Sequence, residues 1–362
     1  MKAERQKRSI GKVMAAISGG VDSSAAALLL KKQGYDCTGA VMRLFTDAIS
    51  ANKSYTSADA SPIADARTAA GQIGIPFRVF DFTEAFAAQV INRFTEAYKT
   101  GSTPNPCVDC NRNIKFGYFH NAALETGCEY IATGHYARID CDNGRYLLKK
   151  GSDMLKDQSY VLYALKQETL SHTIFPLGGL TKTDVRNIAL SHGLTCAEKS
   201  ESQDICFVPD GDYAGFIERN TGAISRPGRF IDTEGNDIGE HKGLHRYTIG
   251  QRRGLGISAR EPLYVCSIDP ENNTVVVGSD EKLFSKTLTA RSINLIPVDT
   301  LDSPVRVTAK VRYKQPEQPA IVRQLDSDTL RVEFDKPQRA ITRGQSVVLY
   351  DGDTVIGGGI IT

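Results

Sequence analysis

The first 130 residues alternate short apolar runs with segments of helical periodicity. Strand-like and helix-like runs follow one another, in the order 13–17, 23–33, 37–42, 64–73, 77–82 and 84–98. A further strand-like run at 130–133 continues the pattern, and a helix is expected to begin near Thr181 or Thr183. Strands separated by helices of this length are typical of βαβ units, which place their strands in a parallel sheet. We therefore predict an α/β N-terminal domain built on a parallel sheet.

The pattern changes near residue 209, where short segments punctuated by Gly, Pro, Asp and Asn begin. After about residue 280, apolar and polar positions alternate with a period of two, as in 305–313, 330–334 and 346–350. Such alternation between turn signals indicates an antiparallel barrel or sandwich. We predict three domains, at 1–208, 209–280 and 281–362, of which the central one is small and the last is a β-barrel.

The composition is that of a soluble globular protein. The chain has 362 residues, of which 41% are hydrophobic and 24% charged, so each of several domains can bury a core. We find no run of about 18 apolar residues that would span a membrane. Eight cysteines are too dilute for a disulfide scaffold, and in a reducing cytoplasm they would be free, catalytic or metal-bound. We expect a cytoplasmic monomer without a membrane partner.

The net charge of +2 means that a nucleic-acid partner would have to bind to local basic patches. One candidate patch contains four arginines, Arg246, Arg252, Arg253 and Arg260. In another, Lys310, Arg312 and Lys314 alternate with Val311 and Tyr313. Charged segments of this kind also occur as plain solvated faces, so the charge alone does not establish nucleic-acid binding.

The string SGGVDSS, at residues 18–24, lies directly between a strand-like run and a helical run. Two adjacent glycines let the backbone approach a ligand closely, and the N–H groups at a helix start favour phosphate. A tight turn without a ligand is the other interpretation. The string lacks the Lys-Ser/Thr ending of the Walker loop and the spacing of the dinucleotide fingerprint. Kinase-type phosphoryl transfer and hydride transfer are therefore not supported.

Two cysteines stand three positions apart, as Cys107 and Cys110 of NPCVDCN. A zinc site would need a second close pair of ligands, which the neighbouring sequence does not supply. A thioredoxin-type pair would begin a helix directly after a strand. Here the pair follows the turn-rich segment 101–106, which indicates a loop that presents a thiol to a ligand. Cys206 lies between Ile205 and Phe207, where a cysteine is often only a small buried hydrophobe.

The string SGGVDSS resembles the phosphate loop of ATP pyrophosphatases. The segments SGGVDSS, TPNPCVDCNRNIKF, ATGHYA, KDQSYVL, ESQDICFVPDGDY, RPGRF, GLHRYTIGQRRGLGI and VRYKQ, in that order, resemble the tRNA-specific 2-thiouridylases. This resemblance covers nearly the whole chain. It implies an adenine-nucleotide α hydrolase-like domain, a small central domain and a C-terminal antiparallel β-barrel.

The resemblance implies ATP-dependent 2-thiolation of the wobble uridine of tRNA, in which ATP and Mg²⁺ adenylate the 2-oxygen before sulfur replaces it. Cys110 matches the nucleophile of the family, and Cys206 matches the cysteine that carries a persulfide. Cys110 would either release sulfide from that persulfide or attack it to form a Cys110–Cys206 disulfide, which a reductant must reset. A rival scheme uses Cys107, Cys110 and Cys206 as three ligands of a [4Fe-4S] cluster that binds sulfur.

The same resemblance implies further roles for residues of the matched segments. Asp22 is expected to take part in catalysis. The residues expected to bind ATP are Ala16, Ile17, Ser18, Gly19, Gly20, Val21, Asp22, Ser23, Met42 and Gly134. Those expected to bind tRNA are Asn105, Pro106, Cys107, His135, Lys156, Asp157, Gln158, Arg312, Tyr313 and Gln345.

The implied partners are tRNA, bound at its anticodon region, and a protein that donates sulfur, either a cysteine desulfurase or a sulfur relay. Two other classes stay open on the sequence. An ATP pyrophosphatase that amidates or ligates a small molecule would need the phosphate loop but not Cys110 and Cys206. A non-enzymatic RNA-binding module built on the barrel would need neither.

Overall fold

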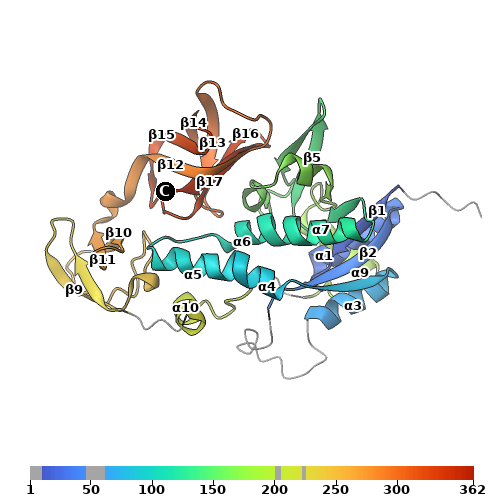
Figure 1. The fold of residues 1–362 in the computed structure, drawn as a ribbon, viewed down its shortest axis with the longest axis horizontal. Helices are drawn as coiled ribbons and strands as arrows, with labels where there is room; N and C mark the ends of the chain where they lie inside the picture. Colours follow the sequence, from blue (N-terminus) through green and yellow to red (C-terminus); the bar gives the residue numbers. More distant parts are fainter. Residues whose placement is uncertain (1–9, 46–61, 200–204, 222–225) are drawn as a thin grey trace, which may run out of the picture. The chain divides into compact units, whose positions relative to one another are not determined.

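The computed structural model describes residues 10–45, 62–199, 205–221 and 226–362 (Figure 1). These residues form two compact units. The first unit comprises the described parts of 1–89 and 108–207, together with 353–355. The second comprises 90–107, the described parts of 208–352, and 356–362. Among the described helices, none is both long and apolar enough to cross a membrane.

The first unit is built on a five-stranded sheet in the order β3-β2-β1-β4-β7. Its strands are β1 (Lys12–Ala16), β2 (Asp36–Arg43), β3 (Phe77–Asp81), β4 (Tyr130–Ala132) and β7 (Thr173–Ile174). Every neighbouring pair in this sheet is parallel. The predicted parallel sheet is therefore confirmed, and β7 is the one strand of it that the apolar pattern did not indicate.

Three helices cover the alanine-rich core of this sheet. They are α1 (Val21–Gln33), α3 (Pro62–Ile73) and α9 (Lys182–Ser191), and α1 packs against both of the others (Figure 1). Val13, Ala15 and Ile17 face this core, as the period-two geometry of a strand requires. The small alanines of α1 and α3 allow the helices to lie close to the sheet, which places the start of α1 directly after β1.

The predicted helix at 84–98 is present as three consecutive pieces. These are α4 (Thr83–Phe86), the π-helix η2 (Ala87–Ile91) and α5 (Asn92–Lys99). Beyond them lies a helical run that the sequence did not predict, made of α6 (Pro106–Asp109), the π-helix η3 (Cys110–Tyr118) and α7 (Phe119–Glu125). The π-helical turns within a helical run are a local widening that is frequent at functional sites.

The start of that run corrects the loop predicted around the two cysteines. The side chain of Asn105 accepts a hydrogen bond from the Cys107 backbone N–H at 3.2 Å, as an N-cap asparagine does. Pro106 occupies the first helical position, where its missing N–H costs nothing. NPC is thus a helix-start signal, and both thiols lie in the first turns of a helix and not in a loop.

A β-hairpin of the first unit was also missed. It consists of β5 (Ala137–Asp142) and β6 (Arg145–Lys150), paired antiparallel. Asn143 and Gly144 form its turn with φ of 50° and 80°, the left-handed conformation that a two-residue Asn-Gly turn favours. The NG dipeptide was therefore an available signal. After the hairpin come the 3₁₀ helix η4 (Ser159–Leu162) and α8 (Gln167–Ser171).

The second unit contains a four-stranded sheet in the order β10-β11-β8-β9. Its strands are β8 (Gly228–Ile231), β9 (Asp237–His241), β10 (Tyr264–Asp269) and β11 (Thr274–Gly278). Phe230, Val265 and Val275 are fully buried in the core of this sheet. The unit also contains α10 (Tyr213–Thr221) and two 3₁₀ helices, η5 (Leu244–Arg246) and η6 (Asp280–Leu283).

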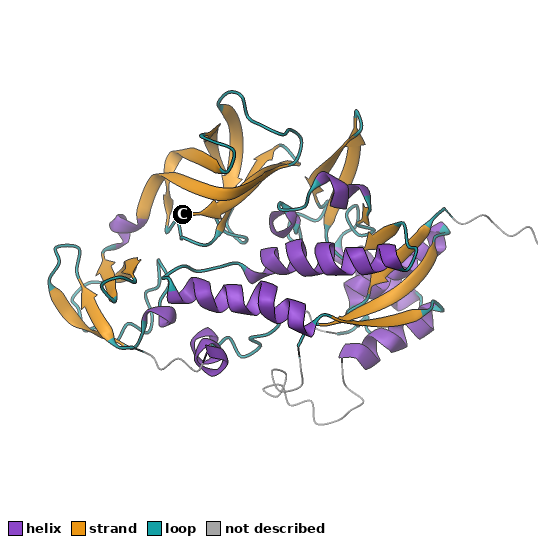
Figure 2. Ribbon diagram, in the orientation of Figure 1, coloured by secondary structure: helices purple, strands orange, loops and turns teal. Residues whose placement is uncertain are grey.

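The C-terminal part of the second unit is a six-stranded antiparallel barrel, as predicted (Figure 2). Its strands are β12 (Phe284–Leu295), β13 (Val305–Lys310), β14 (Gln318–Gln324), β15 (Thr329–Arg339), β16 (Ser346–Asp351) and β17 (Thr354–Ile361). They follow the order β12-β15-β14-β13-β16-β17, and pairing of β12 with β17 closes the barrel. The alternation predicted to 313 ends earlier, because β13 stops at Lys310 and Tyr313 lies in the turn that follows.

Candidate active site

The SGGVDSS segment lies at the carboxyl end of β1, where the order in which strands are added to the sheet reverses. From β1 the chain moves outward to β2 and β3, whereas β4 lies on the opposite side of β1. Ligands of open parallel sheets bind in the crevice at such a switch point. Residues 134–136 follow shortly after β4, so the phosphate loop and the ATGHYA segment meet at the same switch point, which is called the crevice below.

Glycine is required at two positions of this crevice. Gly19 has a φ of +79°, and a Cβ there would lie 2.5 Å from Cβ of Asp65. A Cβ on Gly134 would lie 2.8 Å from the backbone N of Ser23. The backbone after β4 therefore packs directly on the first turn of α1. This contact places two of the residues expected to bind ATP, Gly134 and Ser23, side by side.

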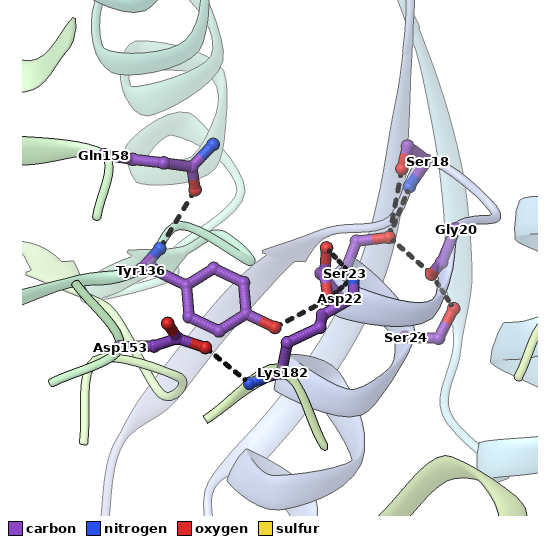
Figure 3. Close-up of polar contacts among 9 residues, drawn as sticks. All are labelled: Ser18, Gly20, Asp22, Ser23, Ser24, Tyr136, Asp153, Gln158 and Lys182. Atoms are coloured by element: carbon purple, nitrogen blue, oxygen red, sulfur yellow. Dashed lines mark hydrogen bonds and ion pairs between the residues drawn. The ribbon is translucent and has the colours of Figure 1, made fainter. Parts of the chain in front are cut away.

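Serine hydroxyls hold the loop in shape (Figure 3). The Ser23 hydroxyl accepts a bond from the Ser18 N–H at 3.0 Å and donates to the Gly20 carbonyl at 3.1 Å. The Ser24 hydroxyl donates to the same carbonyl at 2.9 Å. Gly20 is the N-cap of α1 and supplies no side-chain cap. The first N–H groups of α1 therefore point toward an incoming ligand, as at other helix ends that bind anions.

The carboxylate of Asp22 is the centre of a polar network that the sequence did not reveal (Figure 3). Lys182 Nζ donates to both carboxylate oxygens, at 2.7 and 2.8 Å. The Tyr136 hydroxyl donates to Oδ1 at 2.9 Å. The Lys182 side chain is 11% exposed, and that of Asp22 is 32% exposed. In the sequence, Lys182 is one of many lysines, and its place at a predicted helix start does not distinguish it. Only the tertiary structure shows that it contacts Asp22.

Two residues predicted to contact tRNA bond within the protein, and one of them, Gln158, contacts the tyrosine of this network (Figure 3). The Gln158 side-chain oxygen accepts the Tyr136 N–H at 3.0 Å, which fixes the backbone that bears the tyrosine. Asp157 is buried, and its carboxylate accepts bonds from the N–H groups of Gly151 and Ser159 and from the Ser159 hydroxyl. Lys156 and Gln158 are half-buried, so both are partly open to solvent, whereas Asp157 is buried.

The other residues expected around the nucleotide lie at strand ends. Ala16 ends β1, and Ile17 continues it with a backbone bond to the Ala40 carbonyl at 2.7 Å. Met42 lies near the carboxyl end of β2, half-buried, in register with Phe80 of β3. These positions are at the same edge of the sheet as the phosphate loop, because parallel strands end together.

The three candidate sulfur residues differ in exposure. Cys110 is buried, while Cys107 and Cys206 are exposed. Cys110 and Cys206 belong to the first unit and Cys107 to the second, since the division falls within α6. The neighbouring Asn111 is 2% exposed and donates from its side chain to the Val161 carbonyl at 3.1 Å. That bond ties the helix of Cys110 to η4.

His135 is a buried residue in this structure. Its ring is 7% exposed and packs against those of Phe116 and Phe175, and Nδ1 lies 2.7 Å from the Thr133 hydroxyl. Burial lowers the pKa of His135 well below its ordinary value, with a further contribution from the charge of Lys115. The geometry is that of a neutral core histidine, and its predicted contact with tRNA stays a prediction.

The barrel residues predicted to bind tRNA also bond within the second unit. Arg312 donates to the carbonyls of Ile249 and Ala340 and to the Thr342 hydroxyl, at 2.7–3.2 Å. Gln345 donates to the carbonyls of Thr103 and Pro104 at 2.8 and 3.2 Å. These bonds attach the segments before the NPC helix start and around Gly250 to the barrel. Tyr313, which follows Arg312 in the sequence, is half-buried.

The residues at the phosphate loop are compatible with Mg²⁺ bound together with the phosphates of ATP. Asp22 is a partly exposed carboxylate at a phosphate-binding helix end, the kind of ligand that Mg²⁺ shares with phosphates. Within the described ranges, no three His, Cys, Asp or Glu side chains gather in a way that would hold a metal. The cluster ligands Cys107, Cys110 and Cys206 therefore stay a prediction.

Comparison with known families assigns all three parts of the chain. The family model of the tRNA methyl transferase HUP domain matches residues 11–210. That of the tRNA methyl transferase PRC-barrel domain matches 215–279, and that of the aminomethyltransferase beta-barrel domain matches 285–361. The first of these covers more than half of the chain and includes the whole parallel sheet and the crevice.

Comparison with individual proteins gives the family a specific name. The chain is 50% identical to the tRNA-specific 2-thiouridylase MnmA of Clostridioides difficile, over 97% of this chain and 98% of that protein. It is also 50% identical to the same enzyme of Acetivibrio thermocellus, over 97% and 99%. A solved U34-tRNA thiolase of Methanococcus maripaludis with its [4Fe-4S] cluster is more distant, at 18% identity and a TM-score of 0.35 over 59% of this chain and 67% of that one. At that TM-score the likeness supports no conclusion about a cluster here. The close relatives, matched from end to end, show that the chain belongs to the tRNA-specific 2-thiouridylase family.

Proposed function

We propose that this protein catalyses the ATP-dependent 2-thiolation of the wobble uridine in tRNA. The observation that carries the proposal is the end-to-end match, at 50% identity, to enzymes named for this reaction. The crevice at the end of β1 is consistent with the ATP-dependent step, because it combines a helix N-terminus with two glycines that allow close approach. Cys110 is buried and Cys206 is exposed, and both lie in segments that resemble the sulfur-transfer segments of the family.

The first step makes the 2-oxygen of uridine into a leaving group. A pyrimidine carbonyl oxygen leaves poorly, whereas the same oxygen leaves readily as part of AMP. The loop at Gly19 and Gly20 and the N–H groups of the first turn of α1 would hold the phosphates of ATP, and Gly134 would let the nucleotide lie close to the backbone. Mg²⁺ held with Asp22 supplies positive charge against the phosphates. Pyrophosphate leaves when the oxygen attacks the α-phosphate.

The second step transfers sulfur. A persulfide on Cys206 carries the terminal sulfur atom that bonds to C2 of the activated base as AMP leaves. The Cys110 thiolate attacks the inner sulfur of Cys206, which breaks the S–S bond of the persulfide and forms a Cys110–Cys206 disulfide. In the alternative order, the same attack releases sulfide before sulfide bonds to C2. Either order needs a two-electron reductant to restore the thiols and a sulfur-donor protein to recharge Cys206.

The finer assignments belong to the same proposal. We infer that tRNA contacts the chain through its anticodon region, with Asn105, Pro106 and Cys107 near the target base and the exposed arginines Arg252, Arg253 and Arg260 against the phosphates. Single-stranded bases are recognised by stacking and edge contacts, and flipping the wobble base costs a few kcal/mol. A cytoplasmic monomer with boundaries near 208 and 280 completes the proposal.

The sulfur residues are tested by Cys110→Ser and Cys206→Ser in a reconstituted thiolation assay with a persulfide donor. Each variant is expected to lose at least about 100-fold in 2-thiouridine formation, because the thiolate is the nucleophile and a hydroxyl cannot replace it. Cys141→Ser, at an exposed position of β5 in the same unit, is the matched control and should retain full activity. Normal thiolation by either active-site variant contradicts the persulfide scheme.

The adenylation step and the cluster alternative have separate tests. Incubation with ATP and unmodified tRNA should release pyrophosphate and AMP in equal amounts, and release of ADP and phosphate would contradict adenylation. Anaerobic purification followed by iron and acid-labile sulfide analysis addresses the cluster. About four irons and four sulfides per chain, lost together in Cys107→Ser, would favour the [4Fe-4S] alternative. An enzyme active without iron favours the persulfide.

A further inference from the structure

The ion pair between Lys182 and Asp22 occupies the place where the proposed function needs Mg²⁺ and phosphate. Asp22 is in the first turn of α1, two residues after the N-cap Gly20. Lys182 is the first residue of α9, and its ammonium group bonds to both oxygens of the Asp22 carboxylate. Two helix starts from distant parts of the chain thus direct opposite charges at each other (Figure 3).

The position of the lysine is fixed by its own helix. Thr181 caps α9 through a capping box with Asp184, and the backbone N–H of Lys182 donates to the Asp153 carboxylate at 2.9 Å. The Lys182 side chain is 11% exposed. A nearly buried ammonium needs a partner at all times, because losing one leaves an uncompensated charge in a poor solvent. An anionic ligand in this crevice can therefore become the partner of Lys182 only if another cation binds Asp22.

We propose that Lys182 binds the phosphates of the ligand, and that it stays paired with Asp22 until Mg²⁺ binds the Asp22 carboxylate. This inference rests on the proposed function, since it takes ATP as the ligand. When Mg²⁺ binds the Asp22 carboxylate, the ammonium group of Lys182 transfers its hydrogen bonds to the phosphates of ATP. Without Mg²⁺, Asp22 stays paired with Lys182, so the lysine is not available to the phosphates and ATP alone binds poorly.

Charge accounting supports the exchange. In the resting pair, the charges of Asp22 and Lys182 cancel, so the pair adds no net positive charge to the attraction that the N–H groups and dipole of α1 offer the phosphates. With Mg²⁺ on Asp22, the two residues and the metal together carry a net charge of about +2, on formal charges. Tyr136, whose hydroxyl donates to Asp22 Oδ1 at 2.9 Å, keeps the carboxylate in place while its partner changes. No proton or electron moves in the exchange.

The decisive experiment measures ATP affinity by calorimetry, with Mg²⁺ and with EDTA, for the wild type, Asp22→Asn and Asp22→Asn/Lys182→Met. Asp22→Asn releases the lysine, so ATP in EDTA should bind roughly tenfold more tightly than to wild type, the scale of one charge-assisted hydrogen bond. The added Lys182→Met should remove this gain, and Lys182→Arg in the same background should keep at least part of it.

A lysine that merely neutralises Asp22 gives a different result. The double variant would then bind metal-free ATP as tightly as Asp22→Asn, because the repelling carboxylate is absent from both, and this outcome overturns the proposal. Equal affinity of wild type and Asp22→Asn for metal-free ATP overturns it as well. The double variant buries no unpaired charge, which favours its folding, and thermal melting checks every variant.

Two controls separate the charge from general damage. Adenosine, which lacks phosphates, should bind all variants equally. Lys31→Met removes a lysine of α1 that donates to the carbonyls of Ile73 and Gly74, and it should leave ATP affinity unchanged. If wild type binds no Mg·ATP and releases no pyrophosphate, the proposed function fails. If it does both but the variants show no charge-dependent pattern, only the role of Lys182 fails.

Discussion

At the scale of single residues, the shape of the crevice depends on a missing side chain as well as on polar side chains. Gly134 has no side chain, and this allows the strand-end backbone to contact the first turn of α1. Lys182 and Tyr136 matter for what their polar ends reach, which is the Asp22 carboxylate. In the primary sequence, neither of these two residues differs from its many counterparts elsewhere. The roles of these two residues follow from their contact with Asp22 and not from their residue type.

Gly134→Ala should weaken ATP binding strongly. The added Cβ would lie 2.8 Å from the backbone N of Ser23 and the backbone C of Asp22, and a helix backbone cannot move away at small cost. We expect at least about a tenfold loss of ATP affinity and a loss of unfolding free energy of about 1–3 kcal/mol, the range for overpacking. Calorimetry and urea denaturation measure the two effects.

The matched control for that substitution is Gly179→Ala. A Cβ at Gly179 would meet no atom within 4 Å, so both affinity and stability should stay near wild type. Wild-type ATP affinity in Gly134→Ala would show that the contact between the ATGHYA segment and α1 is not needed for the nucleotide.

At the scale of elements, the starts of helices carry the chemistry. The first turn of α1 faces the crevice without a side-chain cap, α9 presents Lys182 at its first position, and the helical run from Pro106 carries two of the candidate sulfur residues. Helix starts suit these tasks because they combine outward N–H groups with a rigid frame. The capping residues therefore affect function as well as stability.

Thr181→Ala should destabilise the protein and loosen Lys182. The Thr181 hydroxyl accepts a bond from the Asp184 N–H, and Asp184 bonds back to Thr181. Loss of such a cap costs about 1 kcal/mol of unfolding free energy, measurable by urea denaturation. Thr183→Ala, two positions along at an exposed site, should change stability by no more than about 0.5 kcal/mol. Equal effects of the two substitutions would contradict the role of the capping box.

The arginine-rich segment of the second unit should provide salt-dependent tRNA affinity. Arg252 and Arg253 are exposed, so the double change to alanine should weaken binding at every salt concentration tested. The slope of log affinity against log salt should also become shallower by about 0.7–0.9 for each tRNA phosphate that the variant no longer neutralises. Filter binding across a salt series measures both quantities.

Arg306→Ala is the control for this experiment, because Arg306 is an exposed arginine whose guanidinium is paired with Asp335. It should leave the affinity and the slope nearly unchanged. An unaltered slope after loss of Arg252 and Arg253 would show that tRNA does not contact the segment.

At the scale of the whole molecule, each unit buries at least one titratable histidine. Burial lowers the pKa of His120 and His135 in the first unit and of His241 in the second. A histidine whose pKa is lower when folded binds fewer protons in the native state than in the unfolded chain. Its contribution to stability is therefore complete above the unfolded pKa of about 6.5 and is lost as the pH falls below it.

The unfolding free energy should consequently fall as the pH is lowered from 7 toward 5. The buried His135 alone should contribute a slope approaching about 1.4 kcal/mol per pH unit below its unfolded pKa. Urea denaturation at several pH values measures the slope, and His135→Gln should make it shallower. His192→Gln, at an exposed helix end, is the control and should not. A slope that is the same in wild type and His135→Gln would contradict this assignment.

The sequence by itself determined the features that depend on local pattern. Alternating apolar runs predicted the parallel sheet, period-two alternation predicted the barrel, and the runs on either side of SGGVDSS predicted a loop between β1 and α1. These succeed because secondary structure and backbone freedom follow from neighbouring residues. NPC as a helix start and NG as a hairpin turn were equally local signals, and both were missed because Asn, Pro and Gly also occur in loops.

Tertiary structure alone decided which distant residues meet. Lys182 reaches Asp22 across 160 positions, Gln158 supports Tyr136, and Arg312 and Gln345 bond to backbone carbonyls of the second unit. The burial of His135 and Cys110 was likewise not readable, since each residue type occurs both in cores and at sites. Such contacts depend on the strand order and on how each helix packs on its sheet. Neither of these can be predicted from neighbouring residues in the sequence.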